Sequence, residues 1–400
     1  MRLALVALSV VAACADANPR TTSRPPVETA RPRSTVPDSV RRPQATLVST
    51  PDTLRGLYVN RWVAIGPKIW DMIDIARTTE INALVIDVKD DRGLLLYHSS
   101  VPLAREIGAD TTQPMSYKRV QAMLDSMRRL GIYPIARIVV AKDPLLADTH
   151  REWAIHRKDD STQVWLDRNG RPWLDPTNPE VWKYAADISA EAVRLGFSEL
   201  QFDYVRFPDE DRVIDEGRYA KMNGRVRAGV IRDQLGMLRS LVKPLGVPMT
   251  IDVFGLTATD STDMGIGQRW EYFIDRADVV LPMNYPSHFA PGTYGIANPN
   301  AKPYETIGHA LEDAIRRTQG VAGAAKIIPW YQDFTLGPPR YGAAEVRAQI
   351  KSGYASGIPS WLLWNPGSRY SIDALQRDTV ALRKDSLTKT DSLRRDSTRQ

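Results

Sequence analysis

The 400-residue sequence contains a single cysteine, only five histidines and no apolar run long enough to cross a bilayer as a helix. One cysteine excludes an internal disulfide framework and a zinc site built from cysteines. A histidine-based metal site would need ligands at close spacing. The histidines show no such spacing, so we expect neither a metal nor any other cofactor; they are His98, His150, His156, His288 and His309.

The chain also has only a small excess of positive charge. Lysine and arginine number 53 against 47 aspartates and glutamates, which gives a net charge of +6. No dense basic stripe appears inside the folded region, so we expect no nucleic-acid partner. Apolar residues make up 43% and charged residues 25%, which excludes a wholly disordered or collagen-like chain.

Residues 1–14 have the features of a signal peptide. Arg2 is followed by an apolar or small run from Leu3 to Ala13, and then by Cys14. Val11-Ala12-Ala13-Cys14 resembles the lipobox of bacterial lipoproteins, in which the cysteine is lipidated and becomes the mature N-terminus. We therefore expect a membrane-anchored lipoprotein on the periplasmic or extracellular side of the cell envelope. The alternative is an ordinary signal peptide with a chance cysteine.

Two further segments are expected to carry no chemistry. Residues 15–50 are rich in proline, threonine, serine and arginine, with too few large apolar side chains to form a core, so we predict a linker. Residues 383–400 repeat Asp-Ser among basic residues, which predicts a flexible charged tail. The folded domain is therefore predicted at residues 51–382.

Eight short β-branched or aromatic runs recur in this region, each followed by a helical pattern. They are Gly56–Trp62, Ala83–Lys89, Tyr133–Val140, Glu199–Phe207, Pro248–Phe254, Val279–Tyr285, Lys326–Gln332 and Ser360–Asn365. This alternation predicts parallel strands joined by helices, and eight units fit a (β/α)8 TIM barrel. An open doubly wound sheet is the alternative, but no Gly-x-Gly-x-x-Gly follows the first run. Long loops follow the second and third strands and would lie at the C-terminal face, where barrels place their sites.

The fourth run directs an aspartate into the barrel. Side chains in a strand alternate in direction, and the apolar set Leu200, Phe202 and Tyr204 should pack on helices. The other set should therefore face inward; it comprises Gln201, Asp203 and Val205.

Two inward carboxyl groups on adjacent strands suit glycoside hydrolysis. By the same alternation Asp252 of the fifth run points inward, and adjacent strands lie about 4.8 Å apart. One carboxyl group would protonate the leaving oxygen, while the other would attack the anomeric carbon or activate water. Asp333, after the seventh run, is the reserve catalytic carboxylate. The alternative is that one aspartate pairs with Arg137 or Arg206 and only shapes the pocket.

Other strand ends carry side chains that we expect to bind substrate. Asp87 alternates in phase with Lys89, so both are expected to face inward, in one interpretation as a pair. Arg137 lies in an otherwise apolar strand and must find a carboxylate, with Asp87 or Asp203 as the natural partner. Aromatic side chains at the strand ends suit the apolar faces of sugars, although we expect some of these aromatic side chains to be buried against helices. The further substrate-binding candidates are Arg206, Asn284, Tyr285, Trp330, Gln332 and Trp364.

The run Phe202-Asp203-Tyr204-Val205-Arg206-Phe207-Pro208, preceded by Trp173-Leu174-Asp175-Pro176-Thr177-Asn178-Pro179, resembles a family of bacterial envelope proteins with a glycoside-hydrolase-like domain. The resemblance covers residues 54–370. It implies a barrel related to retaining glycosidases whose nucleophile is an aspartate ending the fourth strand, the position of Asp203. In one branch of that group the acid/base ends the fifth strand, where this chain has Asp252 in place of the usual glutamate.

Three functions are compatible with these features. The first is a monomeric, lipid-anchored glycoside hydrolase that cleaves an extracytoplasmic polysaccharide or oligosaccharide with two carboxylates, by a retaining mechanism. The second is a barrel that binds glycan without cleaving it, as a cell-envelope scaffold; neutralisation of Asp252 by Arg137 would favour it. The third is a metal-dependent hydrolase such as a polysaccharide deacetylase, for which the usual histidine ligands are missing.

Overall fold

The computed structural model describes residues 46–209 and 216–376 of the chain. Within these ranges no helix combines the length and the apolar content needed to cross a membrane. Cys14, most of the expected linker and the expected C-terminal tail lie outside the described residues, so lipidation and envelope location stay predictions.

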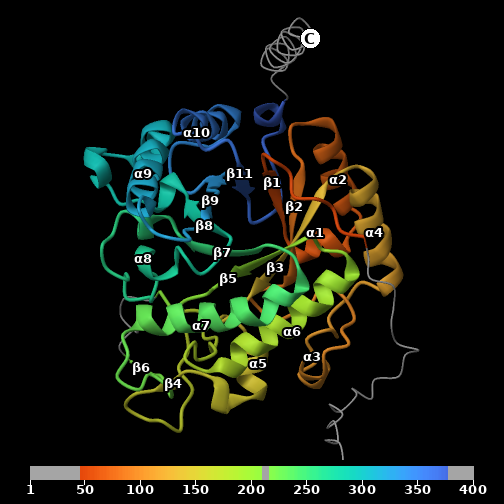
Figure 1. Ribbon diagram of the computed structural model, residues 1–400, viewed down its shortest axis with the longest axis vertical. Helices are drawn as coiled ribbons and strands as arrows, with labels where there is room; N and C mark the ends of the chain where they lie inside the picture. Colours follow the sequence, from red (N-terminus) through yellow and green to blue (C-terminus); the bar gives the residue numbers. More distant parts are fainter. Residues whose placement is uncertain (1–45, 210–215, 377–400) are drawn as a thin grey trace, which may run out of the picture. The chain divides into compact units, whose positions relative to one another are not determined.

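Eight parallel strand positions close into a barrel (Figure 1). In barrel order the strands are β1 (Arg55–Val59), β2 (Ala83–Lys89), β3 (Tyr133–Val139), β5 (Glu199–Asp203), β7 (Met249–Phe254), β8 (Val279–Asn284), the divided seventh strand β9 (Lys326–Ile327) and β10 (Trp330–Gln332), and β11 (Trp361–Trp364). β10 pairs with β8 and β11, and β11 pairs with β1, which completes the ring. The predicted TIM barrel is therefore confirmed, and the open sheet is excluded.

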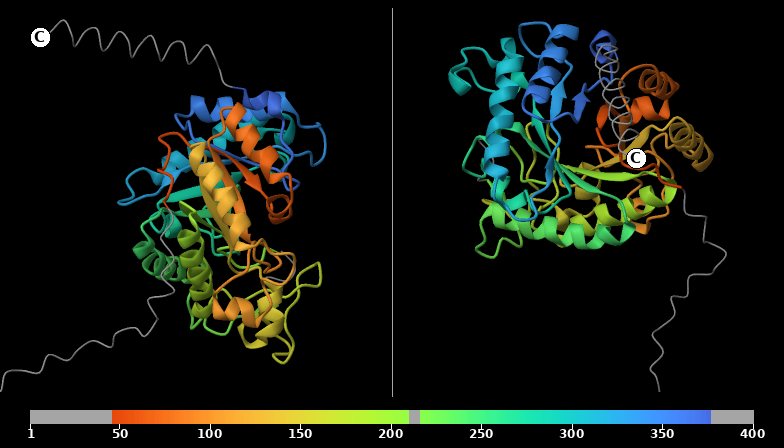
Figure 2. Two further views of the ribbon diagram at one scale, coloured as in Figure 1. Left: turned by 90° about the vertical axis from the view of Figure 1, so that its right-hand side faces the viewer. Right: turned by 45° about the horizontal axis from the view of Figure 1, so that its top comes forward.

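The helices lie outside the strands (Figure 2). They are α1 (Arg61–Ile65), α2 (Ile69–Thr78), α3 (Pro102–Glu106), α4 (Tyr117–Arg129), α5 (Pro144–Thr149), α6 (Pro179–Leu195), α7 (Arg227–Val242), α8 (Trp270–Phe273), α9 (Pro303–Thr318) and α10 (Ala343–Ala355). α6 shows how the sequence sets their ends. The Asn178 side chain accepts a hydrogen bond from the Glu180 amide at its start, and Gly196, with φ +118°, ends it.

Alternating side chains divide the core into two layers. Leu57 and Val59 of β1 pack outward in the cluster that includes the helix side chains. Tyr58, between them, packs inside the barrel with Val85 of β2 and Ile135 of β3. These apolar side chains fill part of the barrel interior, and polar side chains occupy inward positions near the C-terminal ends of the strands.

The long loop after β3 builds a wall beside the C-terminal end of the barrel. It carries α5 and the short strand β4 (His156–Arg157), which forms an antiparallel ribbon with β6 (Gly217–Arg218) from the segment after β5. A separate apolar cluster of Ile155, Trp165 and Trp173 holds this loop together. Trp173 also meets Tyr204, the residue after β5, edge to face at 5.5 Å, so the loop packs against the strand end that bears Asp203.

A buried carboxyl group lies at the N-terminal end of the barrel. Glu199 begins β5, and burial raises its pKa to about 8, against the opposing effect of the nearby Tyr133 and Thr250 hydroxyls. The folded protein therefore holds Glu199 as a neutral acid at pH 7. The unfolded chain ionises this side chain near its ordinary pKa of 4.5.

We expect Glu199→Gln to raise the free energy of unfolding at neutral and alkaline pH. The raised pKa of Glu199 lowers the free energy of unfolding once the pH exceeds 4.5. This loss grows by about 1.4 kcal/mol per pH unit between pH 4.5 and pH 8, and it stays constant above pH 8. At pH 7 it is about 3 kcal/mol, and an uncharged glutamine avoids it. Urea unfolding should show the smallest gain for the variant at pH 4 and the largest at pH 9. A gain independent of pH would contradict a neutral Glu199.

Candidate active site

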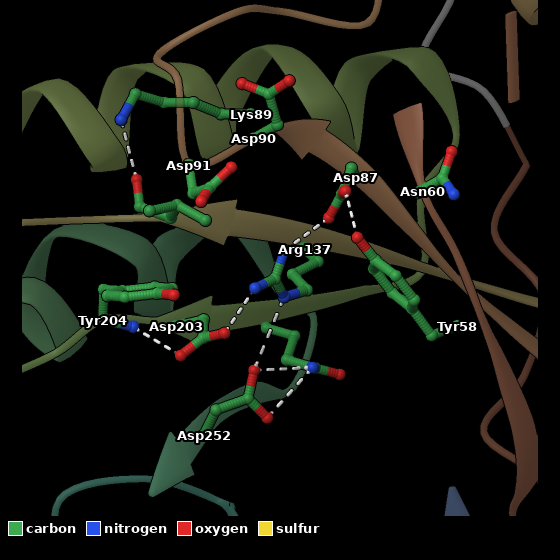
Figure 3. Close-up of polar contacts among 12 residues, drawn as sticks. Tyr58, Asn60, Asp87, Lys89, Asp90, Asp91, Arg137, Asp203, Tyr204 and Asp252 are labelled. Carbon is green, nitrogen blue, oxygen red and sulfur yellow. Dashed lines mark hydrogen bonds and ion pairs between the residues drawn. The ribbon is translucent and has the colours of Figure 1, made fainter. Parts of the chain in front are cut away.

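One guanidinium joins three inward carboxyl groups near the C-terminal ends of four neighbouring strands (Figure 3). Arg137 of β3 pairs with Asp87 of β2 (Nη1–Oδ1, 2.5 Å) and, through Nη2, with Oδ2 of Asp203 on β5. Its Nε lies 3.8 Å from Oδ2 of Asp252 on β7. The Tyr58 hydroxyl of β1 donates to the other oxygen of Asp87 at 2.5 Å. Arg137 thus pairs with both predicted partners; we call Arg137, Asp87, Asp203 and Asp252 the Arg137 cluster.

The carboxyl groups of this cluster differ in their surroundings. Burial raises the pKa of Asp87 to about 6, against the opposing effects of the Arg137 charge and of the Tyr58 hydrogen bond. Burial and then the charge of Asp203 hold the pKa of Asp252 well above its usual range. Burial disfavours the charged form of Arg137, but the carboxylates outweigh it and raise the pKa of the guanidinium. A permanent cation therefore faces an aspartic acid that is poised to be neutral.

Asp252 points into the barrel, as predicted, and is 2% exposed. The Gln201 amide donates to its two oxygens at 3.1 and 2.9 Å, and the Trp330 indole donates to Oδ1 at 2.7 Å. These bonds fix the plane of the carboxyl group next to Asp203. Asp252 is thus held by Gln201 and Trp330 rather than by a tight ion pair with Arg137.

Asp203 also points inward, as predicted, at the last position of β5. The residue after it, Tyr204, has φ +54°, which is uncommon for a side chain other than glycine. This turn directs the Tyr204 amide onto Asp203 Oδ1 at 2.6 Å. The turn also ends the strand alternation, so the expectation that Val205 faces inward is wrong; Val205 packs in the outer core.

Two cations flank the ring of Tyr204, so the expectation that this ring packs on helices is wrong. Lys142 Nζ lies 5.1 Å and Arg206 Cζ 4.8 Å from the ring centre. Arg206 also lies 5.2 Å from the Trp173 ring and 4.6 Å from the Phe254 ring. Arg206, predicted to bind substrate, is therefore packed among aromatic rings, where it holds the turn that follows Asp203.

Two predicted aromatic residues line the Arg137 cluster. The Trp364 ring stacks on Tyr58 with centroids 3.8 Å apart, and Trp330 meets Trp364 edge to face at 5.7 Å. Arg137 Cζ lies 5.1 Å from the Trp364 ring and 5.4 Å from the Tyr58 ring. The carboxyl groups therefore lie beside a wall of flat rings.

Several buried polar atoms without a hydrogen-bond partner belong to β5 and to the end of β8. Within the described residues these are both amide atoms of Asn284, the Tyr285 hydroxyl and Oε1 of Gln201. Tyr285 is close enough to Asp252 and Asp203 that, after burial, their charges raise its pKa well above the usual range. Unpaired buried polar groups cost about 1–3 kcal/mol each, so these atoms fit a ligand that presents hydroxyl groups. Asn284 and Tyr285 were both predicted to bind substrate.

The structure places Lys89 away from the cluster. The pairing of β2 with β3 shifts register between Asp87 and Lys89, so the two side chains do not share a direction. Lys89 Nζ instead binds Asp143 at 2.7 Å and donates to the Val139 carbonyl at 2.8 Å. The expected Asp87–Lys89 pair is therefore wrong, and Lys89 belongs to a fully buried ion pair behind the strands.

Two candidates after the seventh strand are engaged by neighbouring loops. Asp333 accepts hydrogen bonds from the Ser371 amide and hydroxyl, both at 2.8 Å. Gln332 donates to the Phe334 carbonyl at 2.8 Å and accepts from the Ser287 amide at 3.1 Å. The structure does not bring either side chain into contact with the Arg137 cluster.

Three site residues were not among the sequence candidates. Gln201 was expected to face inward but was not named as a site residue, and the same strand periodicity could have found Tyr58, which packs inside the barrel. Lys142 lies in the loop after β3, where no periodic signal exists. In residues 46–209 and 216–376, no group of three or more histidine, cysteine, aspartate or glutamate side chains could hold a metal ion.

Comparisons with known proteins identify the family and the fold of this chain. A sequence model of the family described as "Putative glycosyl hydrolase domain" matches residues 56–370. No curated protein matches the sequence. A hypothetical protein from Ruminiclostridium thermocellum is 34% identical, over 49% of this chain and 97% of that chain, with a TM-score of 0.44.

Two solved glycosidase structures share the barrel. The PgaB (BpsB) glycoside hydrolase domain from Bordetella bronchiseptica has a TM-score of 0.57 at 13% identity, covering 82% of this chain and all (100%) of that chain. Alpha-L-fucosidase isoenzyme 2 from Paenibacillus thiaminolyticus has a TM-score of 0.53 at 12% identity, covering 81% of this chain and 48% of that chain. At such identities the likeness extends to the fold alone.

Proposed function

Because the chain belongs to the family described as "Putative glycosyl hydrolase domain", we propose that it hydrolyses glycosidic bonds with Asp203 as nucleophile and Asp252 as acid/base. The observation that carries this proposal is the contrast between two carboxyl groups on adjacent strands. Asp203 faces a guanidinium and an amide, which are both donors. Asp252 lies beside it with its pKa held well above the usual range. Such a contrast separates a nucleophile from an acid.

The chemistry is a double displacement. Asp203 attacks the anomeric carbon while Asp252 gives its proton to the glycosidic oxygen, so the leaving group departs as an alcohol and a glycosyl ester remains on Asp203. Asp252, now a carboxylate, takes a proton from water, and the water oxygen attacks the anomeric carbon. The sugar leaves with retained configuration, and both carboxyl groups are restored.

Arg137 and Asp87 keep the charge balanced during these steps. The Asp203 carboxylate loses its charge when the ester forms, and Arg137 then loses one partner. Asp87 remains paired with Arg137 and is itself held by the Tyr58 hydroxyl. The buried guanidinium is therefore never left without a carboxylate, an arrangement that would otherwise cost several kcal/mol.

The unpaired atoms of Asn284, Tyr285 and Gln201 would bind the hydroxyl groups of the sugar, and Trp364 would pack on its apolar face. We also propose that the glycan lies outside the cytoplasm. Its support is the signal-peptide pattern of residues 1–14 with its lipobox-like end at Cys14.

Reducing-end release from a panel of bacterial polysaccharides and aryl glycosides tests the function. We expect the purified protein to cleave at least one member, with the configuration of the first product determined by proton NMR. Retention at the anomeric carbon would support the nucleophile, whereas inversion would make Asp203 a base that activates water. Binding of a glycan without release of sugar from any member would instead support a cell-envelope scaffold.

A further inference from the structure

Three exposed aromatic side chains lie at the C-terminal face of the barrel. Trp62, Trp70 and Tyr117 are 42%, 45% and 41% exposed. Each lies in the first turn of a helix that follows β1 or β2: Trp62 in α1, Trp70 in α2 and Tyr117 in α4. A helix that follows a barrel strand starts at the carboxyl end of that strand, so these rings share a face with Asp203.

The three helix starts are held together. The Arg119 guanidinium in the first turn of α4 donates to the Ile65 carbonyl at the end of α1, at 2.6 Å. Arg61 of α1 donates to the Leu95 carbonyl at 2.8 Å and to the Thr112 carbonyl in the loop before α4. α1 also packs against α2 and lies near both α2 and α4 in Figure 1. We call Trp62, Trp70 and Tyr117 the aromatic platform.

The aromatic platform continues from the Arg137 cluster along the chain. Tyr58, which binds Asp87, is followed by Asn60, whose side chain accepts from the Val63 amide and so begins α1. Asn60 also bonds to the loop after β11, through the Pro366 carbonyl and the Ser368 hydroxyl, both at 3.0 Å. Trp62 is two residues further on. The segment between the cluster and the first platform ring is therefore short and fixed at both sides.

The surroundings and the exposure of the three rings suit the binding of sugars. Arg61 is 1% exposed, and its guanidinium carbon lies 4.9 Å from the Trp62 ring centre, so a buried cation supports this ring while part of the ring faces solvent. The exposed large apolar side chains in these first turns are all aromatic, whereas an apolar protein interface would also expose aliphatic ones. Flat rings with polar neighbours suit the faces of pyranose units.

We propose that the aromatic platform binds sugar units of a polysaccharide chain that extends beyond the catalytic carboxylates, which makes a polymer the substrate class. This inference rests on the proposed function, since the continuing chain is the one cleaved at Asp203. It goes further, because the Arg137 cluster by itself would serve a disaccharide equally well.

Native gels containing laminarin, xylan, pullulan, glycol chitin or hydroxyethylcellulose test the platform. The parent protein carries Asp203→Asn, so that the polymer is not consumed, and the test variant adds Trp62→Ala, Trp70→Ala and Tyr117→Ala. A matched control adds Leu130→Ala, Leu241→Ala and Tyr354→Ala, which remove exposed side chains near the opposite ends of α4, α7 and α10. Circular dichroism establishes that all three proteins are folded.

We expect at least one polymer to retard the parent and the control equally, and the platform variant to bind it at least tenfold more weakly. Retardation by none of the five polymers, or equal retardation of platform variant and parent, would overturn the platform. Hydrolysis of 4-nitrophenyl glycosides by the unsubstituted protein is a separate readout. If the platform substitutions weaken retardation but no aryl glycoside is hydrolysed, the platform is supported and the proposed function is contradicted. If an aryl glycoside is hydrolysed but the substitutions leave retardation unchanged, the proposed function is supported and the platform is contradicted.

Discussion

Replacing Asp203 by asparagine is expected to lower kcat by about 10⁴-fold, equivalent to about 5.5 kcal/mol of transition-state stabilisation. Asparagine keeps the size of the side chain and an oxygen that can accept from the Tyr204 amide. It cannot form the glycosyl ester, because an amide is a poor nucleophile. The measurement is the initial rate on a substrate identified in the panel, with glycan binding followed separately. Retained binding would show that the barrel is still folded around Arg137.

Asp333→Asn is the matched control for this substitution. Asp333 is also a buried aspartate at a strand end, but its oxygens accept from Ser371 and do not contact Arg137. We expect its kcat to stay within about tenfold of the parent value. Comparable losses in the two variants would mean that Asp203 only supports the fold. Restoration of Asp203→Ala by azide, with a glycosyl azide of inverted configuration, would show that Asp203 is the attacking group.

Most of the barrel could be predicted because its signals are local. Strand runs alternate with helices whose ends are marked by residues such as Asn178 and Gly196, and all eight predicted strands are present. The inward direction of Asp203 and Asp252 follows from strand alternation alone. Arg137 could be predicted to find a carboxylate because an isolated charge in an apolar strand is too costly to leave unpaired.

The errors arise where backbone geometry departs from a regular strand. The register shift after Asp87 turns Lys89 toward Asp143, and the positive φ of Tyr204 turns Val205 outward. Neither irregularity has a glycine or proline to mark it in the sequence. The position of Lys142 depends on how the loop after β3 folds on itself and brings Lys142 near Trp173, and no periodic pattern marks such a contact.

The Arg137 cluster is compatible with the proposal that Asp252 is the acid/base, at a position where the resemblance implies a glutamate. Asp252 is shorter, and its carboxyl group is fixed by Gln201 and by the Trp330 indole, which reaches across the barrel from β10. Arg137 approaches Asp252 only to 3.8 Å while it binds Asp87 at 2.5 Å. The cation is therefore directed mainly at the other carboxylates, and the proton of Asp252 is retained.

Replacing Asp252 by asparagine should produce a loss that depends on the leaving group. For an alcohol leaving group, kcat/KM should fall by about 10³-fold, because the departing oxygen receives no proton. For a 2,4-dinitrophenyl glycoside it should fall by less than about tenfold, since that phenolate leaves without protonation. The parent should lose activity as pH rises through the raised pKa of Asp252, because the acid form is the active one, and this alkaline limb should be absent from the variant.

Asp87→Asn distinguishes proton donation by Asp252 from a general disturbance of the Arg137 cluster. Asp87 also contacts Arg137 but has no path to the leaving oxygen, because Arg137 and Tyr58 occupy its two oxygens. We therefore expect its rate loss to be equal for the two leaving groups, whereas that of Asp252→Asn differs by about a hundredfold between them. If Asp252→Asn slowed both substrates equally, Asp252 would be a binding residue and the acid would have to be sought on another strand. The comparison thus separates proton donation from simple support of the nucleophile, because only a proton donor responds to the basicity of the group that leaves.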